Sequence, residues 1–182
     1  MSKKFFTPKT LAIMGLLIAI NIVMERFLSF KKGPLNFSCA FISICIASMS
    51  LGPVGGAVTA ALADIIRSLL FPQGPFFPLF TVSQFLYGLS YGWILYNKRL
   101  HPLKISIFVA IQYFLLHILL GSVWYYLYAN IVLNNAKALI PLILSRLSAA
   151  AVNLPVHILG VNLTAKYLYP PISKYTKNLL DN

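Results

Sequence analysis

Residues 10–30 read TLAIMGLLIAINIVMERFLSF, an apolar run whose only charges, Glu25 and Arg26, lie close to its end. An α-helix needs about 20 apolar residues to cross roughly 30 Å of hydrocarbon. The run therefore predicts a helix that spans a membrane. Because it continues to Phe30 without a small-residue cleavage site, we do not expect it to be a cleavable signal peptide.

Similar apolar segments follow along the rest of the chain. The expected helices cover residues 10–30, 38–51, 54–71, 79–96, 105–127 and 138–169. Gly52-Pro53 separates the second helix from the third, and little of the 182-residue chain is left for anything else. We therefore expect an all-α integral membrane protein, a single domain over 1–182 with one bundle of six transmembrane helices and short tails at 1–9 and 170–182.

The composition agrees with a membrane protein and excludes one common class of basic protein. The chain is 59% hydrophobic and 10% charged, whereas soluble domains carry about 25% charged residues. Its net charge of +12 is high, but a nucleic-acid-binding protein needs those charges on a solvated surface. Here the basic residues flank the apolar segments. We therefore expect membrane lipid, and no nucleic acid, around this chain.

The lysines and arginines predict how the helices are oriented. Nine of them precede the first expected helix, separate the fourth from the fifth, or end or follow the sixth: Lys3, Lys4, Lys9, Lys98, Arg99, Lys104, Lys166, Lys174 and Lys177. With six spans these residues fall on one side, which the positive-inside rule makes cytoplasmic. The other side receives Lys31, Lys32 and Lys137. We expect a multi-pass protein of the bacterial plasma membrane with both termini in the cytoplasm.

Five charged side chains lie within the expected helices, where charges are costly and often functional. They are Glu25, Arg26, Asp64, Arg67 and Arg146. Asp64 and Arg67 are three residues apart and can pair on one helix face. Three arginines face two acids, so at least one buried cation lacks a partner and favours an anionic ligand. The alternative is a set of internal ion pairs that only hold the helices together.

Aromatic and amide side chains gather near the outer ends of the expected helices. The candidates for ligand binding among them are Asn36, Phe37, Phe76, Phe77, Gln84, Tyr87, Trp124 and Tyr125. An aromatic belt at the membrane interface would use the same residue types. A pocket for a flat heteroaromatic ligand would use them too, with a few polar groups to orient it. The proline-rich loop 72–78 could then form its lid.

We expect no catalytic machinery, cofactor or metal site in this chain. Gly88 to Gly92 matches the G-x-S-x-G motif of serine hydrolases, and an intramembrane hydrolase pairing Ser90 with His157 is the remote alternative. Glycine and serine are common where helices touch in lipid, so packing is the favoured interpretation. Cys39 and Cys45 have no metal-ligand spacing, and we expect them to be small packing residues.

Small residues recur in two of the segments. They are Ala12, Gly15 and Ala19 in the first expected helix, and Gly52, Gly56 and Ala60 at the start of the third. Such faces let helices approach each other closely in lipid. The residues alone favour packing within the monomer, and the alternative is a docking face for another membrane protein.

The chain resembles the substrate-binding S components of energy-coupling factor (ECF) vitamin transporters, most of all the folate family, from residue 10 to about 168. The resembling segments are MERFLS (24–29), LGPVGG (51–56), LADII (62–66) and PQGPFFPLFTVS (72–83), with YG at 87–88. Gly-Pro after the second helix is widespread among S components, so the Pro-x-Gly-Pro-Phe-Phe-Pro stretch is the specific part.

The resemblance implies a protein without enzymatic activity that binds a vitamin from outside with high affinity. S components then join a transmembrane coupling protein and two cytoplasmic ATPase subunits, which power release inward. The face formed by Ala12, Gly15 and Ala19 would be the surface that docks on those partners.

Within this family the expected ligand is folate, which carries a flat pterin and a dianionic glutamate tail. Arg26 and Arg146 would hold the tail, since arginine binds carboxylates through a bidentate fork. Asp64 or Gln84 could accept from the pterin amino group, although Asp64 could instead serve Arg67. Another vitamin, such as riboflavin or pantothenate, is the alternative.

Overall fold

The structure is a computed structural model that describes residues 7–32, 35–72, 75–96, 101–132, 138–168 and 170, with backbone only for the strand residues between 30 and 37. Its elements are α1 (Pro8–Phe27), β1 (Ser29–Lys32), β2 (Leu35–Ser38), α2 (Phe41–Leu70), α3 (Pro78–Leu95), α4 (Pro102–Gln112), η1 (Tyr113–Leu120), α5 (Gly121–Leu127), η2 (Tyr128–Val132), α6 (Leu139–Leu163) and η3 (Thr164–Leu168). The η elements are π-helical turns, so α4 to η2 form one continuous helix, as do α6 and η3.

Prolines mark where three of the helices begin. Pro8, Pro78 and Pro102 each lie in the first turn of their helix, where proline's fixed φ suits the helix and its missing N–H costs nothing. Thr7 caps α1 by accepting a hydrogen bond from the Thr10 backbone N–H at 3.2 Å. These local signals place the helix starts within a few residues of the predicted ones.

Gly52 breaks α2 where the sequence predicts a break. Its φ is +80° and its ψ is −175°, a left-handed conformation that glycine adopts without a steric penalty. The chain nevertheless continues directly into Pro53 and the second arm. Instead of separate helices at 38–51 and 54–71, the described residues therefore form one kinked helix, and the described bundle has five continuous helices where six were expected.

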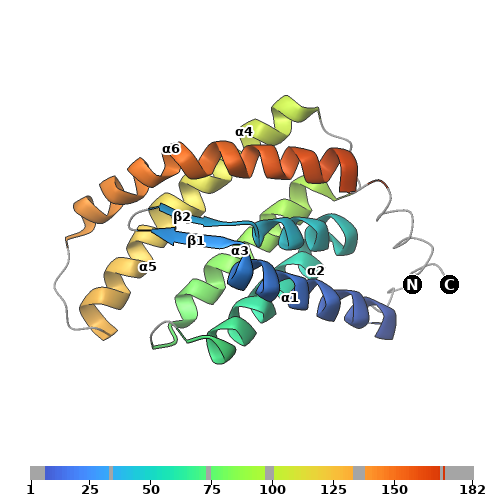
Figure 1. Cartoon of the computed structure of the whole chain (residues 1–182), viewed down its shortest axis with the longest axis horizontal. Coiled ribbons are helices and arrows are strands. Elements are labelled where there is room, and N and C mark those ends of the chain that lie inside the picture. Colours follow the sequence, from blue (N-terminus) through green and yellow to red (C-terminus); the bar gives the residue numbers. More distant parts are fainter. Residues whose placement is uncertain are drawn as a thin grey trace.

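The sequence did not predict the β-hairpin between α1 and α2. Helix α1 ends at Phe27, three residues before the expected end, and Ser29 then pairs with Ser38 in an antiparallel ladder. Four-residue strands are too short to show a clear alternation of apolar and polar residues. The hairpin lies between α1 and α6 (Figure 1), where it brings Ser38 toward the middle of the bundle.

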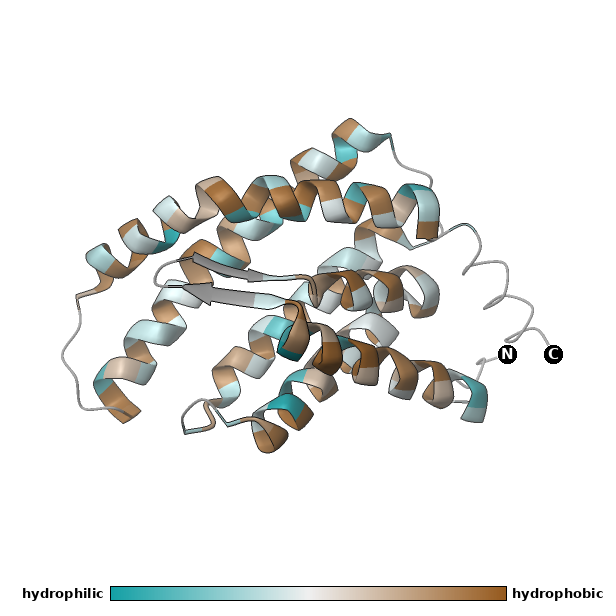
Figure 2. Ribbon diagram, viewed as in Figure 1, coloured by the Kyte–Doolittle hydropathy of each residue, from teal (hydrophilic) through white to brown (hydrophobic). Residues whose placement is uncertain are grey.

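Among the described residues, four helices are long and apolar enough to cross a membrane: Pro8–Phe27, Phe41–Leu70, Pro102–Val132 and Leu139–Leu168. Large apolar side chains such as Leu16 and Leu159 are exposed on the outside of the bundle. Figure 2 shows hydrophobic segments along all of the helices. The described helices therefore have the length and the apolar outer surface of membrane-spanning helices.

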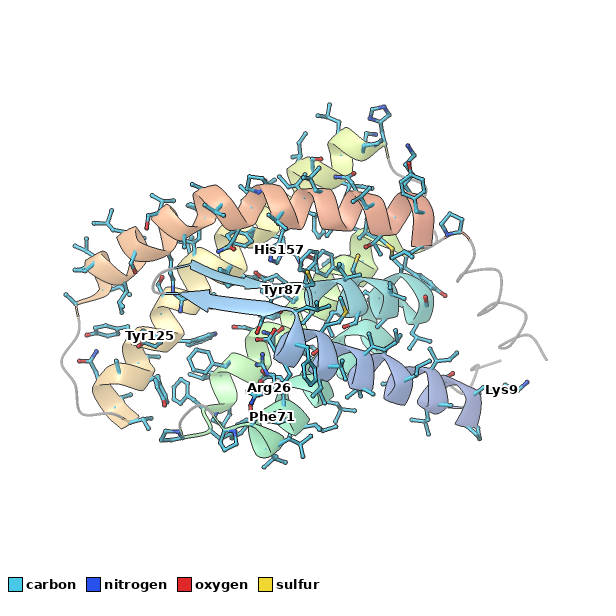
Figure 3. The ribbon with its side chains drawn as sticks, viewed as in Figure 1. Lys9, Arg26, Phe71, Tyr87, Tyr125 and His157 are labelled. Atoms are coloured by element: carbon cyan, nitrogen blue, oxygen red, sulfur yellow. The ribbon has the colours of Figure 1, made fainter. Side chains whose placement is uncertain are left out.

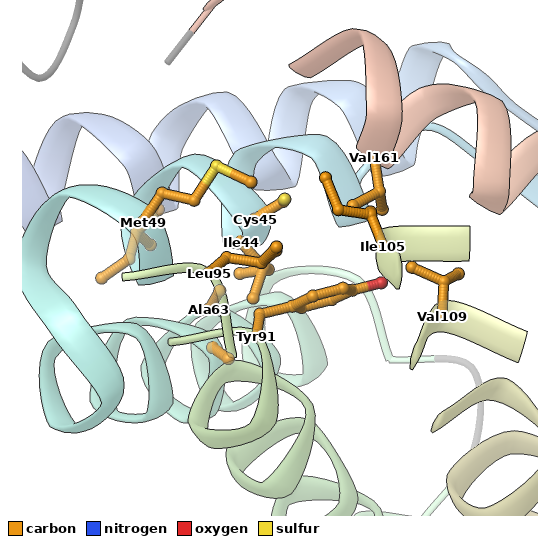
Figure 4. Close-up of a cluster of buried hydrophobic side chains, with 11 residues drawn as sticks. Ile44, Cys45, Met49, Ala63, Tyr91, Leu95, Ile105, Val109 and Val161 are labelled. Atoms are coloured by element: carbon orange, nitrogen blue, oxygen red, sulfur yellow. The ribbon is translucent and has the colours of Figure 1, made fainter. Parts of the chain in front are cut away.

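Helices α2 and α3 pack closely along a seam of small residues. A Cβ atom at Gly88 would lie 2.3 Å from the Gly56 carbonyl oxygen, and one at Gly92 would lie 2.4 Å from the Pro53 Cα. The Ser48 hydroxyl donates to the Gly88 carbonyl at 2.9 Å across the same seam. Figure 4 shows the neighbouring apolar cluster around Tyr91, in which Cys45 is fully buried, as its predicted packing role requires.

Candidate binding cavity

A cavity of about 280 Å³ lies within the bundle, lined by the hairpin and by helices from both halves of the chain. Its lining comes from α1, β2, α2, α3, η1 and α6. The lining residues are Asn21, Glu25, Ser38, Ala40, Phe41, Ile44, Ala60, Asp64, Arg67, Gln84, Tyr87, Tyr91, Tyr113, His117 and His157. Aromatic side chains and a few charged ones predominate, which is typical of a small-molecule site.

A charged cluster forms one wall of this cavity. Arg67 hydrogen-bonds to Asp64 Oδ1, and the Thr81 hydroxyl donates to Asp64 Oδ2 at 2.7 Å. A second carboxylate oxygen, Glu25 Oε1, lies 3.5 Å from Arg67 Nη1, and Glu25 accepts a hydrogen bond from the Ser38 hydroxyl. The cluster ties α1, the hairpin, α2 and α3 together, and within it Asp64 pairs with Arg67.

Stacked rings form the opposite wall. His157 on α6 stacks on Phe41, with ring centres 4.1 Å apart and planes 20° from parallel, and Tyr113 meets His157 edge-on at 5.2 Å. Tyr87 from α3 points toward His157 in Figure 3. The π-helical turn η1 supplies Tyr113 and His117, in keeping with the tendency of π turns to occur at functional sites.

Asn21 fixes the relation of α1 to the start of α2. Its side-chain amide donates to the Ala40 carbonyl at 2.8 Å and to the Ser43 hydroxyl at 2.9 Å. Both bonds are buried, so they are stronger than they would be in water. They hold the segment that connects the hairpin to α2 beside the cavity.

Three of the predicted ligand-binding residues line the cavity: Asp64, Gln84 and Tyr87. Three others, Trp124, Tyr125 and Arg146, come from α5 and α6 and are not among the lining residues. Arg146 Nη1 donates to the His117 carbonyl at 3.2 Å, and its Cζ lies 5.9 Å from the centre of the Tyr125 ring. Arg146 therefore lies directly behind the part of the wall that His117 forms.

Arg26, Phe76 and Phe77 are not in the cavity wall. The Arg26 guanidinium lies 5.1 Å from the centre of the Phe71 ring, at the C-terminal ends of α1 and α2. Phe76 is 52% exposed, and Phe77 packs against Phe80 and Tyr128 with ring centres 5.6 Å away in both cases. The side chains of Asn36 and Phe37 lie outside the described part of the structure.

Sequence reasoning missed most of the cavity wall. Glu25 and Arg67 had a usable signal, because both are charges within expected helices, but only the fold shows that they face the same space. The remaining missed residues are Asn21, Ser38, Ala40, Phe41, Ile44, Ala60, Tyr91, Tyr113, His117 and His157. No spacing in the sequence links these side chains, since they come from six different elements and the segment that precedes α2.

The hydrolase alternative finds no support in the hydrogen bonds of Ser90. Its hydroxyl donates to the Tyr87 carbonyl at 2.9 Å and accepts from Gln112 Nε2 at 2.5 Å, while His157 stacks on Phe41. The flanking Gly88 and Gly92 are the two glycines of the α2–α3 seam. The G-x-S-x-G match therefore has a packing role, as predicted.

Comparisons with known proteins place the chain in a family. The family model for the ECF transporter substrate-specific component matches residues 9–172. The folate transporter FolT of Clostridium novyi (strain NT) is 28% identical over 144 residues, which are 79% of this chain and 80% of that protein. FolT of Leuconostoc mesenteroides subsp. mesenteroides is 25% identical over 113 residues, 62% of this chain and 60% of that protein.

A solved structure has the same fold. A crystal structure of FolT bound with folic acid matches this chain with a TM-score of 0.74 and 28% identity, over 89% of this chain and 95% of that one. The family match covers nearly the whole chain and agrees with its apolar helices and internal cavity. The chain belongs to the substrate-specific components of ECF transporters.

Proposed function

We propose that this chain binds folate from outside a bacterial plasma membrane and delivers it inward as the S component of an ATP-driven ECF transporter. The observation that carries the proposal is the cavity of about 280 Å³, which lies in a chain with the fold of a FolT that was crystallised with folic acid. Riboflavin and pantothenate are the alternatives within the family.

The chemistry of the cavity suits a pterin. Stacked and tilted rings from Phe41, His157, Tyr113 and Tyr87 offer flat apolar surface to a heteroaromatic ligand. Gln84 in the wall has both a donor and an acceptor, which matches the mixed edge of a pterin. Riboflavin also carries a flat ring system, but pantothenate does not, so the aromatic wall disfavours pantothenate.

The glutamate tail of folate would bind Arg146. Glu25 and Asp64 both contact Arg67, so Arg67 already has carboxylates around it. Within the described residues no carboxylate lies at ion-pair distance from Arg146, and this half-buried guanidinium retains donors for a ligand. Arg26 is exposed and lies over Phe71, which makes it the weaker candidate of the two predicted tail-binding arginines.

The transporter partners would be a transmembrane coupling protein and two cytoplasmic ATPase subunits. Ala12, Gly15 and Ala19 are all exposed along α1, and a Cβ at Gly15 would have nothing within 4 Å. A face this open permits close approach by another helix. The start of α1 and the end of η3 lie at the same end of the bundle (Figure 1), which fits both termini in the cytoplasm.

Uptake into proteoliposomes tests this function. The chain reconstituted with a coupling protein and both ATPase subunits should accumulate radiolabelled folate only when ATP is supplied on the cytoplasmic side. An excess of unlabelled riboflavin or pantothenate should leave that uptake unchanged. Accumulation of labelled riboflavin or pantothenate in place of folate would reassign the vitamin.

A further inference from the structure

Arg146 on α6 is held by contacts that leave its charge uncompensated within the described residues. One N–H of its guanidinium goes to the His117 carbonyl at 3.2 Å, and the Tyr125 ring centre lies 5.9 Å from Cζ. The guanidinium has five N–H donors in a planar fork. A carbonyl and a ring face can hold such a group in place, but a carboxylate binds it far better.

Gly121, the first residue of α5, provides the space for this guanidinium. A Cβ atom at Gly121 would lie 2.8 Å from Arg146 Nη1, closer than a Cβ atom ever approaches a neighbour, and 3.5 Å from Cζ. The third neighbour, the Leu116 carbonyl oxygen, would be at an ordinary 3.5 Å. The missing side chain therefore forms a notch in which the tip of Arg146 lies.

The backbone itself does not require glycine at this position. Gly121 has a φ of −61° and a ψ of −34°, which are ordinary helical angles for any residue. An alanine would fit the helix, and the only atoms in its way would be the end of a flexible side chain. The substitution should therefore displace Arg146 without disturbing the fold.

We propose that Gly121 is a positioning residue for Arg146, and that this pair gives the cavity its preference for ligands with an anionic tail. The inference rests on the proposed folate-binding function and adds a selectivity element to it. Arg146 lies directly behind His117, whose side chain lines the cavity while its carbonyl holds the guanidinium. Moving the guanidinium out of the notch breaks that arrangement.

The test measures binding of folate and of pteroate, which has the pterin and the aromatic ring but no glutamate tail. Gly121→Ala should weaken folate binding about tenfold, the equivalent of roughly 1.4 kcal/mol. Arg146→Met should weaken folate binding by about ten- to a hundredfold, the range for a hydrogen bond to a charged group. Pteroate affinity should change less than about twofold in either variant.

A double variant shows whether Gly121 acts through Arg146. In protein that already carries Arg146→Met, adding Gly121→Ala should cause no further loss of folate affinity, because the side chain it displaces is gone. A second loss in that background would overturn the proposal. So would equal weakening of folate and pteroate by Gly121→Ala, or no weakening of folate.

Failure of the proposed function gives a different result. If wild-type protein binds no folate, folate is the wrong ligand and this inference falls with it. If wild type binds folate and the variants behave otherwise than expected, the inference about Gly121 and Arg146 is wrong while folate binding stands. Thermal unfolding of each variant, which should match wild type, separates lost binding from lost folding.

Discussion

The two small-residue faces of this molecule look alike in sequence and differ completely in structure. Ala12, Gly15 and Ala19 on α1 are exposed, whereas Gly52, Gly56 and Ala60 on α2 are buried. The α2 face is covered by α3, whose Gly88 would place a Cβ 2.3 Å from the Gly56 carbonyl oxygen. At Gly15 a Cβ would have nothing within 4 Å.

The difference teaches that a small-residue face shows where another helix can approach closely. It does not show whether that helix belongs to the same chain or to another protein. In lipid there is little hydrophobic force between helices, so close packing of small residues must supply much of the attraction. The α2 face already has its partner within the chain. The α1 face has none within the described residues, and the docking proposal gives it a partner in another protein.

The largest effect is expected from filling the closed face. Gly88→Val would drive two methyl groups into the α2 backbone, which cannot move aside as a flexible side chain does. We expect this overpacking to lower the stability by about 3 kcal/mol. Thermal unfolding in detergent measures the loss, and Gly15→Val is the matched control, expected to stay within about 0.5 kcal/mol. Equal unfolding of both variants would mean that the two faces do not differ.

Two arginines differ in a similar way, because one lies beside the cavity and the other is exposed. Arg146 lies beside the cavity wall and Arg26 lies exposed over Phe71. Arg146→Met should cost folate binding about 1.5–3 kcal/mol, and Arg26→Met should cost less than about 0.5 kcal/mol. Calorimetry of the purified variants decides. A larger loss for Arg26→Met would mean that the glutamate tail of folate binds near Arg26, at the C-terminal ends of α1 and α2.

Filling the open face should affect transport and not ligand binding. Ala12→Trp and Ala19→Trp add bulk where a partner helix must come close. Uptake by the full complex should fall about tenfold, the equivalent of roughly 1.4 kcal/mol of lost docking. Folate binding by the chain alone should persist. If binding and transport fall together, the α1 face packs within the molecule and the docking proposal fails.

The smallest effect is expected at Ser90, beside the two seam glycines. Ser90→Ala removes a hydroxyl that accepts from Gln112, which keeps a second acceptor in the Tyr87 carbonyl at 3.3 Å. A loss of stability of about 0.5–1 kcal/mol is expected, with folate uptake unchanged. Abolished uptake in a folded Ser90→Ala protein would require a functional role for this serine.

The sequence predicted the secondary structure well and the cavity poorly, for one physical reason. Apolar runs and Gly52-Pro53 act locally, so the helical segments and the break at Gly52 could be predicted from neighbouring residues, although the two arms form one kinked helix instead of two helices. The hairpin was missed because its strands are only four residues long.

The cavity depends on contacts between residues far apart in the chain. Counting charges indicated that at least one arginine would lack an acid, but it could not show which one, or that Glu25 and Asp64 would both contact Arg67. Phe41, Tyr113 and His157 come together only because α2, η1 and α6 pack side by side. A periodic pattern in one segment carries no information about its contacts with distant segments.

The central claim is that this chain alone binds folate in its internal cavity. Isothermal titration calorimetry of the purified protein in detergent, without ATP or partner subunits, tests it most directly against folate, riboflavin, pantothenate and thiamine. The account predicts one folate bound tightly per chain, with the other three vitamins much weaker. Tighter binding of any of those three, or no heat of binding with folate, would contradict it.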